Sequence, residues 1–412
     1  MWSAACAACG AGPGQLPASA RQQAVRPGIE VLLSDSMHLV RGRRVGLVTN
    51  QSGVDSRGRR DVDRLLAAGV RVTALFGPEH GFNGRLDVDT RPAGAVERDS
   101  ATGLPVYALH DGVRPIGPTP AMLADIDILL LDLQDAGARY YTYAATAVLV
   151  MQSAATARIP VVVLDRPDPI GGLVQGNALD SATPSAVARL PVAMRHGMTL
   201  GELARLANGV LGLGADLTVV PVAGWRRTMA LDQTGLPLVP PSLNLRSMES
   251  LFHYPGLCLF EGTALSVGRG SDAPFEQIGA PWLDAAGVVA ALGEAPMGGV
   301  RFSAVRFTPD HPGDGKFDGQ RLNGIRLHVT DRARYDPTAT AVYLLSAITA
   351  RHPGRIALDS ARFDRLAGGP ALRQALERAE DPAAIVRSWE PARRRFLERR
   401  RPYLIYGDVP AR

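Results

Sequence analysis

Lysine is nearly absent from this chain. Lys316 is its single lysine, although lysine and arginine together number 45 against 40 aspartates and glutamates, so the positive charge is carried by arginine. These arginines are spread along the chain among acidic residues, whereas a nucleic-acid-binding surface clusters its positive charge. The formal net charge of +5 therefore does not indicate a nucleic-acid partner.

Long apolar runs are absent and cysteine is scarce. No run of 18 apolar residues occurs, so the sequence predicts no transmembrane helix. Cys6 and Cys9 form a Cys-x-x-Cys pair in a small-residue N-terminal stretch, but no βαβ context around them favours redox chemistry. We interpret residues 1–26 as the remnant of an export signal, which predicts a periplasmic or secreted protein. A disordered tail and a lipid-anchored lipoprotein are the alternatives.

Several motifs of nucleotide, hydrolase and metal chemistry are also missing. The turn after the first predicted strand reads TNQSG rather than Gly-x-Gly-x-x-Gly, and no Walker-type phosphate loop occurs. There is no Gly-x-Ser-x-Gly nucleophile motif, no His-x-x-x-His set, and no second cysteine pair that could complete a metal site with Cys6 and Cys9. We therefore expect no cofactor and no metal, and chemistry that relies on carboxylates, as in glycoside hydrolysis.

Short apolar runs alternate with helical patterns in the first half of the chain. A capping box at Thr199 and Glu202 and a Thr119-Pro120 pair mark helix starts, and residues 142–159 read as a long helix. Continuous apolar strands between helices indicate a mostly parallel sheet covered on both faces, a Rossmann-like α/β fold. The predicted strands are 44–52, 70–77, 105–109, 127–134, 160–167 and 216–225.

The second half reads differently. Residues 240–256 are rich in loop signals and are expected to bridge two domains, while 300–309 and 322–331 alternate like strands with one solvated face. The length of 412 residues favours two domains. We predict a Rossmann-like catalytic domain over 27–255 and a smaller α+β domain over 256–412.

Polar residues follow several of the predicted parallel strands. The carboxyl ends of parallel strands lie along one edge of a sheet, where ligands bind in open α/β folds. For Asp132 and Asp165, capping of local backbone is an equally good interpretation. We expect one cleft to be surrounded by Asn50, Gln51, Glu79, His80, Asp132, Gln134, Asp135, Arg139, Asp165 and Arg166.

The segment LFGPEHGFNG carries the strongest candidate. Pro78 fixes the backbone before Glu79, and Gly77 and Gly81 permit close approach of a ligand. A carboxyl group at a cleft edge suits general acid/base work. His80 has the alternative interpretation of an ordinary loop histidine.

A glycine-rich segment in the second half, residues 257–282, contains Glu261 and Arg269. Long ordered loops with polar residues are commonly functional. We interpret this segment as a pocket wall, with a purely structural loop as the alternative.

Long motifs identify a family resemblance. The segments GLVTNQSGV, LFGPEHGFNG, DILLLDLQDAGARYYTY, VVLDRPDPIGG, HGMTLGELA, YPGLCLFEGTALSVGRG, PFEQIGAPW and RRPYLIY resemble the NamZ family of exo-acting β-N-acetylmuramidases, from about Pro27 to Tyr406. The resemblance implies a Rossmann-like catalytic domain, an ancillary domain and a cleft between them. It also implies removal of terminal N-acetylmuramic acid from the non-reducing end of peptidoglycan fragments.

The resemblance assigns roles to individual residues. The proposed catalytic glutamate of the family matches Glu79, which we expect to be the general acid, with Asp135 or Glu261 as the second group. Muramic acid carries a lactyl carboxylate, which a guanidinium such as that of Arg139 or Arg269 would bind through paired hydrogen bonds. The expected substrate-binding residues are Asn50, Gln51, His80, Gln134, Arg139, Tyr143 and Arg269.

Three positions depart from the pattern of many members. Gln175 replaces a glutamate, and Ala264 and Val267 differ in the Glu-Gly-Thr segment. These changes leave two alternatives to muramidase activity: a glycosidase for another amino sugar, and a non-catalytic glycan-binding protein of the same fold.

Overall fold

The computed structural model describes residues 24–407, apart from 88–90, 93, 182–184, 186 and 294. Cys6, Cys9 and nearly all of the expected export signal lie outside the described residues. Within the described part of the chain, no helix combines the length and apolar character needed to cross a membrane.

The main sheet has seven strands in the order β3-β4-β2-β1-β5-β6-β9. All neighbouring pairs are parallel except β3 with β4. The chain begins at the centre and adds strands first on one side and then on the other, which is doubly wound Rossmann topology and confirms the predicted fold class. The strands are β1 (Arg44–Thr49), β2 (Arg71–Gly77), β3 (Val96–Arg98), β4 (Pro105–Ala108), β5 (Ile128–Asp132), β6 (Val161–Leu164) and β9 (Leu217–Val220).

Apolar side chains cover both faces of this sheet. Leu130 belongs to one apolar cluster together with Ile29 and Val62, whereas its neighbour Leu131 belongs to another together with Val148. Alternation between two buried faces explains why the strands read as continuous apolar runs. The helices of this part are α1 (Gly28–Asp35), α2 (Asp61–Ala67), α3 (Pro120–Leu123), α4 (Thr142–Ala157) and α5 (Leu200–Val210), with the 3₁₀ turns Met37–Leu39 and Leu231–Gln233.

Two predicted helix starts are confirmed in detail. The Thr199 hydroxyl accepts the Glu202 amide at the start of α5, and the Glu202 carboxylate accepts the Thr199 amide, which is a capping box. At α3, Thr119 is the N-cap and Pro120 the first helical residue.

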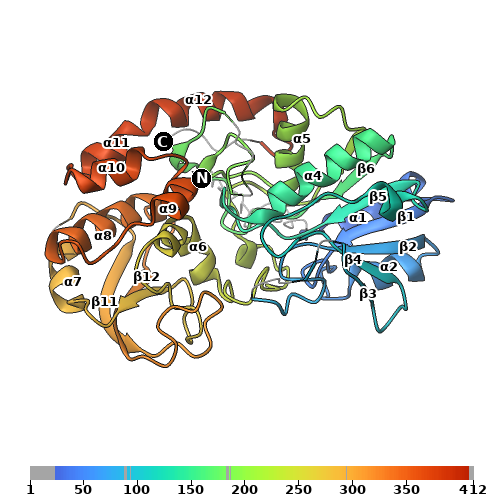
Figure 1. The fold of residues 1–412 in the computed structure, drawn as a ribbon. Coiled ribbons are helices and arrows are strands. Elements are labelled where there is room, and N and C mark those ends of the chain that lie inside the picture. Colours follow the sequence, from blue (N-terminus) through green and yellow to red (C-terminus); the bar gives the residue numbers. More distant parts are fainter. Residues whose placement is uncertain are drawn as a thin grey trace, which may run out of the picture.

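The second part is built around a three-stranded antiparallel sheet of order β10-β12-β11 (Figure 1). A separate hairpin, β7 (Gln175–Ala178) with β8 (Ala193–Arg195), belongs to the first part. The elements are α6 (Met248–Leu257), a 3₁₀ turn (Cys258–Gly262), β10 (Gln277–Ala280), α7 (Ala285–Gly293), β11 (Val300–Phe307), β12 (Leu322–Val329), α8 (Pro337–Arg351), α9 (Ser360–Ala367), α10 (Ala371–Glu377), α11 (Pro382–Ser388), α12 (Glu390–Arg400) and a 3₁₀ turn (Arg401–Tyr403).

The expectation of a loop-rich bridge over 240–256 is wrong for its second half. Residues from Met248 onward form helix α6, whose N-cap Ser247 accepts the Ser250 amide. Pro255 lies in the last turn of α6, so the hydrogen bond lost with its N–H affects only the end of the helix.

One continuous apolar cluster joins the two parts. It includes Met151 of α4, Phe252 of α6, Leu345 of α8 and Phe396 of α12. In Figure 1, α12 lies above the second part and reaches toward α5, and it packs against β7. The two parts therefore share a core, and the end of the chain closes back on the first part.

The last described residues, 401–407, form a C-terminal strap on the first part. The Tyr406 hydroxyl donates to Asp165 Oδ2 at 2.7 Å and accepts the Val222 amide at 2.8 Å, and the Thr199 hydroxyl donates to the same carboxylate oxygen. Burial raises the pKa of Asp165 to about 6. Asp165 Oδ1 also accepts the Arg166 and Gly201 amides, so Asp165 has the backbone-capping role that was its structural interpretation.

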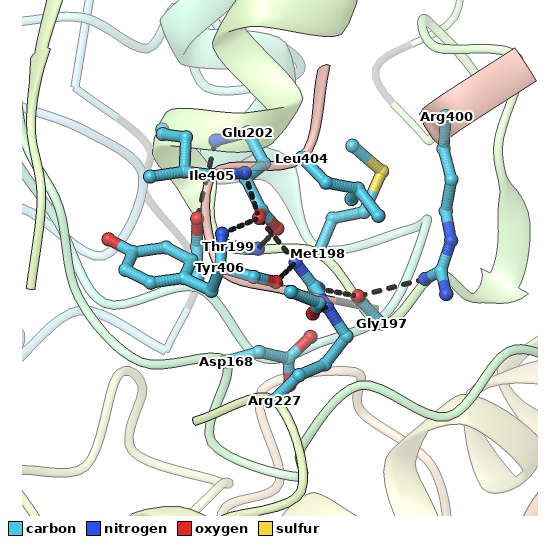
Figure 2. Close-up of polar contacts among 12 residues, drawn as sticks. Asp168, Gly197, Met198, Thr199, Glu202, Arg227, Arg400, Leu404, Ile405 and Tyr406 are labelled. Carbon is cyan, nitrogen blue, oxygen red and sulfur yellow. Dashed lines mark hydrogen bonds and ion pairs between the residues drawn. The ribbon is translucent and has the colours of Figure 1, made fainter. Parts of the chain in front are cut away.

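A second contact of the strap centres on Glu202 (Figure 2). Its Oε1 forms a buried ion pair with Arg227 and accepts the Ile405 amide at 2.8 Å. The Gly197 carbonyl accepts hydrogen bonds from both Arg227 and Arg400. The strap is therefore tied to the start of α5, and the buried Glu202 carboxylate is paired with Arg227 where the strap docks.

We predict that Tyr406→Phe lowers the free energy of unfolding by about 1–3 kcal/mol, because it leaves the buried Val222 amide without its acceptor and removes one of the donors to Asp165. Urea unfolding followed by circular dichroism measures this. Tyr343→Phe is the control, since that half-buried hydroxyl has no hydrogen bond recorded among the described residues. Equal stability of the two variants would contradict the role of the strap.

Candidate active site

A cavity of about 460 Å³ lies between the end of β2, the start of α4 and loops of the second part. Both parts of the chain contribute to its wall, and the wall combines carboxylates, guanidiniums and tyrosines. Its chemically distinctive side chains are Glu79, His80, Asp87, Tyr140, Tyr141, Thr142, Tyr254, Cys258, Glu261, Arg269, Asp314 and Arg362.

Glu79 lies in this wall directly after β2. The hydroxyl of Thr142, the first residue of α4, donates to Glu79 Oε2 at 2.5 Å. The turn continues through His80 and Gly81, both with positive φ, and the His80 ring nitrogen Nδ1 lies 2.8 Å from the Leu86 carbonyl oxygen. The left-handed backbone at His80 is a strained conformation of the kind found at functional sites. The structure thus places Glu79 at the edge of a cavity, on a turn fixed by its neighbours.

His110 approaches Glu79 from the end of β4. Its Nε2 lies 3.9 Å from Glu79 Oε1, while its Nδ1 accepts the Gly112 amide at 3.1 Å. Acceptance at Nδ1 places the proton of a neutral ring on Nε2, which faces Glu79. His110 was not predicted as a site residue, although it follows a predicted parallel strand just as Glu79 does.

Arg269 is held between two carboxylates in the cavity wall. Its Nε and Nη2 donate to Glu261 Oε1 at 2.9 and 2.6 Å, and its Nη1 donates to Asp87 Oδ1 at 2.8 Å. Burial favours the neutral form of Arg269, but the two carboxylates outweigh it and raise its pKa. Asp87 also accepts the amides of the Asn244 side chain and the Gly313 backbone. This cluster ties the loop that follows Glu79 to the second part.

Glu261 is kept ionised by its neighbours. Burial favours its neutral form, but the charges of Arg269 and Arg362 prevail and lower its pKa. The single lysine supports the same turn, because Lys316 Nζ donates to the carbonyls of Glu261, Thr263 and Leu265 at 3.1, 2.7 and 3.0 Å. The glycine-rich segment thus forms a pocket wall, as predicted.

Asn50 and Tyr143 brace the cavity from beneath and do not line it. Asn50 donates its amide to the Tyr143 hydroxyl at 2.6 Å, and that hydroxyl donates to the Pro241 carbonyl at 3.0 Å. The same hydroxyl lies 3.4 Å from the Glu79 carbonyl oxygen. Their predicted contact with substrate stays a prediction, while their observed contacts position the Glu79 turn.

Gln51 and Gln134 also bond to backbone. Gln51 Nε2 donates to the carbonyls of Pro240 and Pro241, and a Cβ at Gly84, where φ is +63°, would meet the Gln51 carboxamide at 2.1 Å. Gln134 Nε2 donates to the carbonyls of Asp135 and Pro167. The positive φ therefore favours glycine at position 84, and a side chain there would displace the Gln51 carboxamide.

Asp135 lies in a buried cluster outside the cavity wall. Its Oδ2 accepts the Gly137 amide at 2.7 Å and lies 3.2 Å from His196 Nε2, while Asp168 Oδ2 lies 3.8 Å from the other ring nitrogen of His196. Burial raises the pKa of Asp168 to about 7. Among the strand-end acids, Asp132 is likewise buried, in an ion pair with Arg166.

Arg139 is buried and joins the two parts. Its guanidinium donates to the carbonyls of Asn177, Val192 and Leu366 and to the Asn177 side-chain oxygen. Burial lowers its pKa to about 10. Arg139 does not line the cavity, and its donors are directed to backbone, so fewer strand ends form the cavity than the sequence pattern predicts.

The three positions that depart from the family pattern also lie outside the wall. Gln175 accepts Arg195 Nη1 at 2.8 Å and donates to the Tyr335 carbonyl at 2.9 Å. Val267 is fully buried, and the Ala264 amide bonds to the Ile356 carbonyl. These changes therefore alter packing beneath the cavity and not the side chains that line it.

We predict that Asp168→Asn changes the pH dependence of stability. The pKa of Asp168 rises from its ordinary 3.8 to about 7, so between these values the folded protein binds a proton that the unfolded chain releases. The free energy of unfolding of the wild type therefore falls by up to about 4 kcal/mol as the pH rises from 4 to 7. In the asparagine variant this contribution is absent.

Thermal unfolding at pH 4.5, 6 and 8 measures this effect. The melting temperature of Asp168→Asn should rise relative to that of the wild type as the pH rises. Asp216→Asn is the control, because Asp216 is exposed and its carboxylate has no hydrogen bond recorded in the described part of the chain. A difference between Asp168→Asn and the wild type that is independent of pH would contradict the prediction.

Comparisons with known proteins identify the family. The chain matches the N-terminal model of exo-β-N-acetylmuramidase NamZ over residues 45–249 and the C-terminal model over 252–406. It is 39% identical over 402 residues to the peptidoglycan β-N-acetylmuramidase NamZ of Bacillus subtilis. The aligned region covers 97% of this chain and 95% of that protein.

Comparison with solved structures supports the same relationship. Two DUF1343 family proteins from Bacteroides fragilis are similar to this chain with TM-scores of 0.84 and 0.74 and identities of 33% and 30%. Each match covers 93% of this chain and 99% of the other. The chain therefore belongs to the NamZ family of exo-β-N-acetylmuramidases and is a glycoside hydrolase.

Proposed function

We propose that this enzyme removes terminal N-acetylmuramic acid from the non-reducing end of peptidoglycan fragments by carboxylate acid/base catalysis. The named activity of the Bacillus subtilis relative supports the substrate class. The observation that carries the mechanism is that Glu79 and Glu261 line one cavity, which at about 460 Å³ has the size of a small-ligand site. Peptidoglycan lies outside the cytoplasmic membrane, and we propose that the enzyme acts there.

Glu79 is the general acid in this proposal. The Thr142 hydroxyl donates a hydrogen bond to Glu79 Oε2. The proton that passes to the departing glycosidic oxygen is therefore carried by Glu79 Oε1. After the transfer, Oε1 is negative and faces His110 Nε2 at 3.9 Å. The imidazole N–H then stabilises the charge left on Glu79, which makes His110 a positioning residue.

Glu261 is the second carboxylate in preference to Asp135. Asp135 is buried against His196 and does not line the cavity, whereas Glu261 does. Because Arg269 and Arg362 lower the pKa of Glu261, Glu261 remains negative, as the second carboxylate must. Opposite protonation states of two carboxyl groups are what acid-catalysed glycoside cleavage requires. The negative group stabilises the positive charge that develops on the sugar ring, and water completes the hydrolysis by adding to the anomeric carbon and losing a proton.

We expect Glu79→Gln to lower kcat/KM on a chromogenic β-N-acetylmuramide by at least about 100-fold, because the amide cannot donate the proton. Release of the chromophore measures this. Glu97→Gln is the matched control, since Glu97 is exposed on β3 and lies outside the cavity wall. Wild-type activity in Glu79→Gln would exclude Glu79 as the acid, and a wild type inactive on the muramide would refute the proposed function.

Thr142→Val should lower kcat/KM by about 10-fold, because it removes one hydrogen bond to the Glu79 carboxyl while keeping the shape of the side chain. The same assay measures the loss. Thr156→Val, an exposed position of the same helix, should leave the rate unchanged. An unaltered rate in Thr142→Val would show that this hydrogen bond does not position Glu79 for catalysis.

A further inference from the structure

The two arginines of the cavity wall differ in how far their donors are used. Every nitrogen of the Arg269 guanidinium donates to Glu261 or Asp87, and its side chain is only 17% exposed. By contrast, Arg362 Nη2 donates to Glu261 Oε2 at 3.2 Å, and the Arg362 side chain is 41% exposed. Among the described residues, this is the one hydrogen bond recorded for the Arg362 side chain. Arg362 thus has guanidinium donors left for a ligand.

The substrate class supplies a ligand of matching charge. N-Acetylmuramic acid differs from N-acetylglucosamine by a lactyl ether that carries a carboxylate. A guanidinium binds a carboxylate through paired, charge-assisted hydrogen bonds, which lysine does not reproduce. We propose that Arg362 binds this lactyl carboxylate and so makes the enzyme specific for muramic acid. The inference rests on the proposed function.

The surrounding charges favour Arg362 over other positions. Asp87, Glu261 and Asp314 also line the cavity and repel an anionic ligand. Asp87 and one oxygen of Glu261 are matched by Arg269, and the other oxygen of Glu261 takes a single donor from Arg362. Arg362 is therefore the residue of the cavity wall that can bind the lactyl carboxylate of the ligand.

Helix α9 holds Arg362 in place. Its N-cap Asp359 accepts the amides of Ala361 and Arg362, and the adjacent Phe363 is fully buried. The carbonyl of Leu366, near the end of the helix, accepts Arg139. A fixed backbone limits the conformational entropy that Arg362 loses when it binds. Arg139, expected from sequence to bind the lactyl group, thus supports the helix that carries Arg362.

The test compares two chromogenic β-N-acetylmuramides, one with the free lactyl carboxylate and one with that carboxylate converted to its uncharged primary amide. We expect the wild type to prefer the acid. Arg362→Gln should lose about 10–100-fold in kcat/KM on the acid, the size of a charged hydrogen bond, and less than about 3-fold on the amide. Arg362→Lys, which keeps the charge, should recover part of the preference.

Arg365→Gln is the matched control, because Arg365 lies on the same helix and is exposed outside the cavity wall. It should keep the wild-type preference, and thermal unfolding of each variant tests that it is folded. An equal loss on both substrates in Arg362→Gln would overturn the proposal, since it would mean that Arg362 acts only by holding Glu261. A wild type that does not distinguish acid from amide would also overturn it, while the proposed function would stand. A wild type inactive on both would instead refute the proposed function.

Discussion

The ion pairs of Arg269 with Asp87 and Glu261 are the constraint on which the cavity depends. Asp87 belongs to the loop that follows Glu79 in the Rossmann-like part, and Glu261 lies on the 3₁₀ turn after α6 in the second part. One guanidinium therefore fixes the distance between the two walls. The same contact holds Glu261 ionised, so a single cluster sets both the shape of the cavity and the charge of one carboxylate. Removing Arg269 would leave the Asp87 carboxylate without its cation, which is destabilising.

Polar residues at the strand ends mostly support the site from below. Asn50, Tyr143 and Gln51 connect the ends of β1 and the start of α4 to the carbonyls of residues 240–241. Buried polar groups need hydrogen-bond partners, and these residues find them in backbone. Glu79 and His80 are left to face the cavity. The rigid network beneath them is what allows a short glycine-framed turn to hold a carboxyl group in one position.

The shared core and the strap fix the two parts of the chain relative to each other. An apolar cluster runs from α4 through α6 to α12, and the strap docks on Asp165 and Glu202. Arg139 adds a polar link by donating to the carbonyl of Leu366 on α9. A substrate cavity built from both parts can then keep its geometry, because neither part moves without breaking buried contacts.

The sequence by itself determined the elements whose causes are local. Apolar runs and the Thr199–Glu202 capping box specify strands and helix starts, and Gly-Pro-Glu-His marks a turn at the end of β2. The sequence did not reveal helix α6, because the loop signals of residues 240–256 include the residues that form it. Tertiary structure decided which of the predicted polar groups reach the cavity and which do not. Asp135 contacts His196, and Arg139 donates to backbone carbonyls. His110 lies near the carboxylate of Glu79, and Arg362 contacts that of Glu261, although both carboxylates are distant in the chain. Arg269 and Asp87 are 182 residues apart, and no periodicity or spacing encodes a contact of that range, since it exists only when packing brings the two segments together.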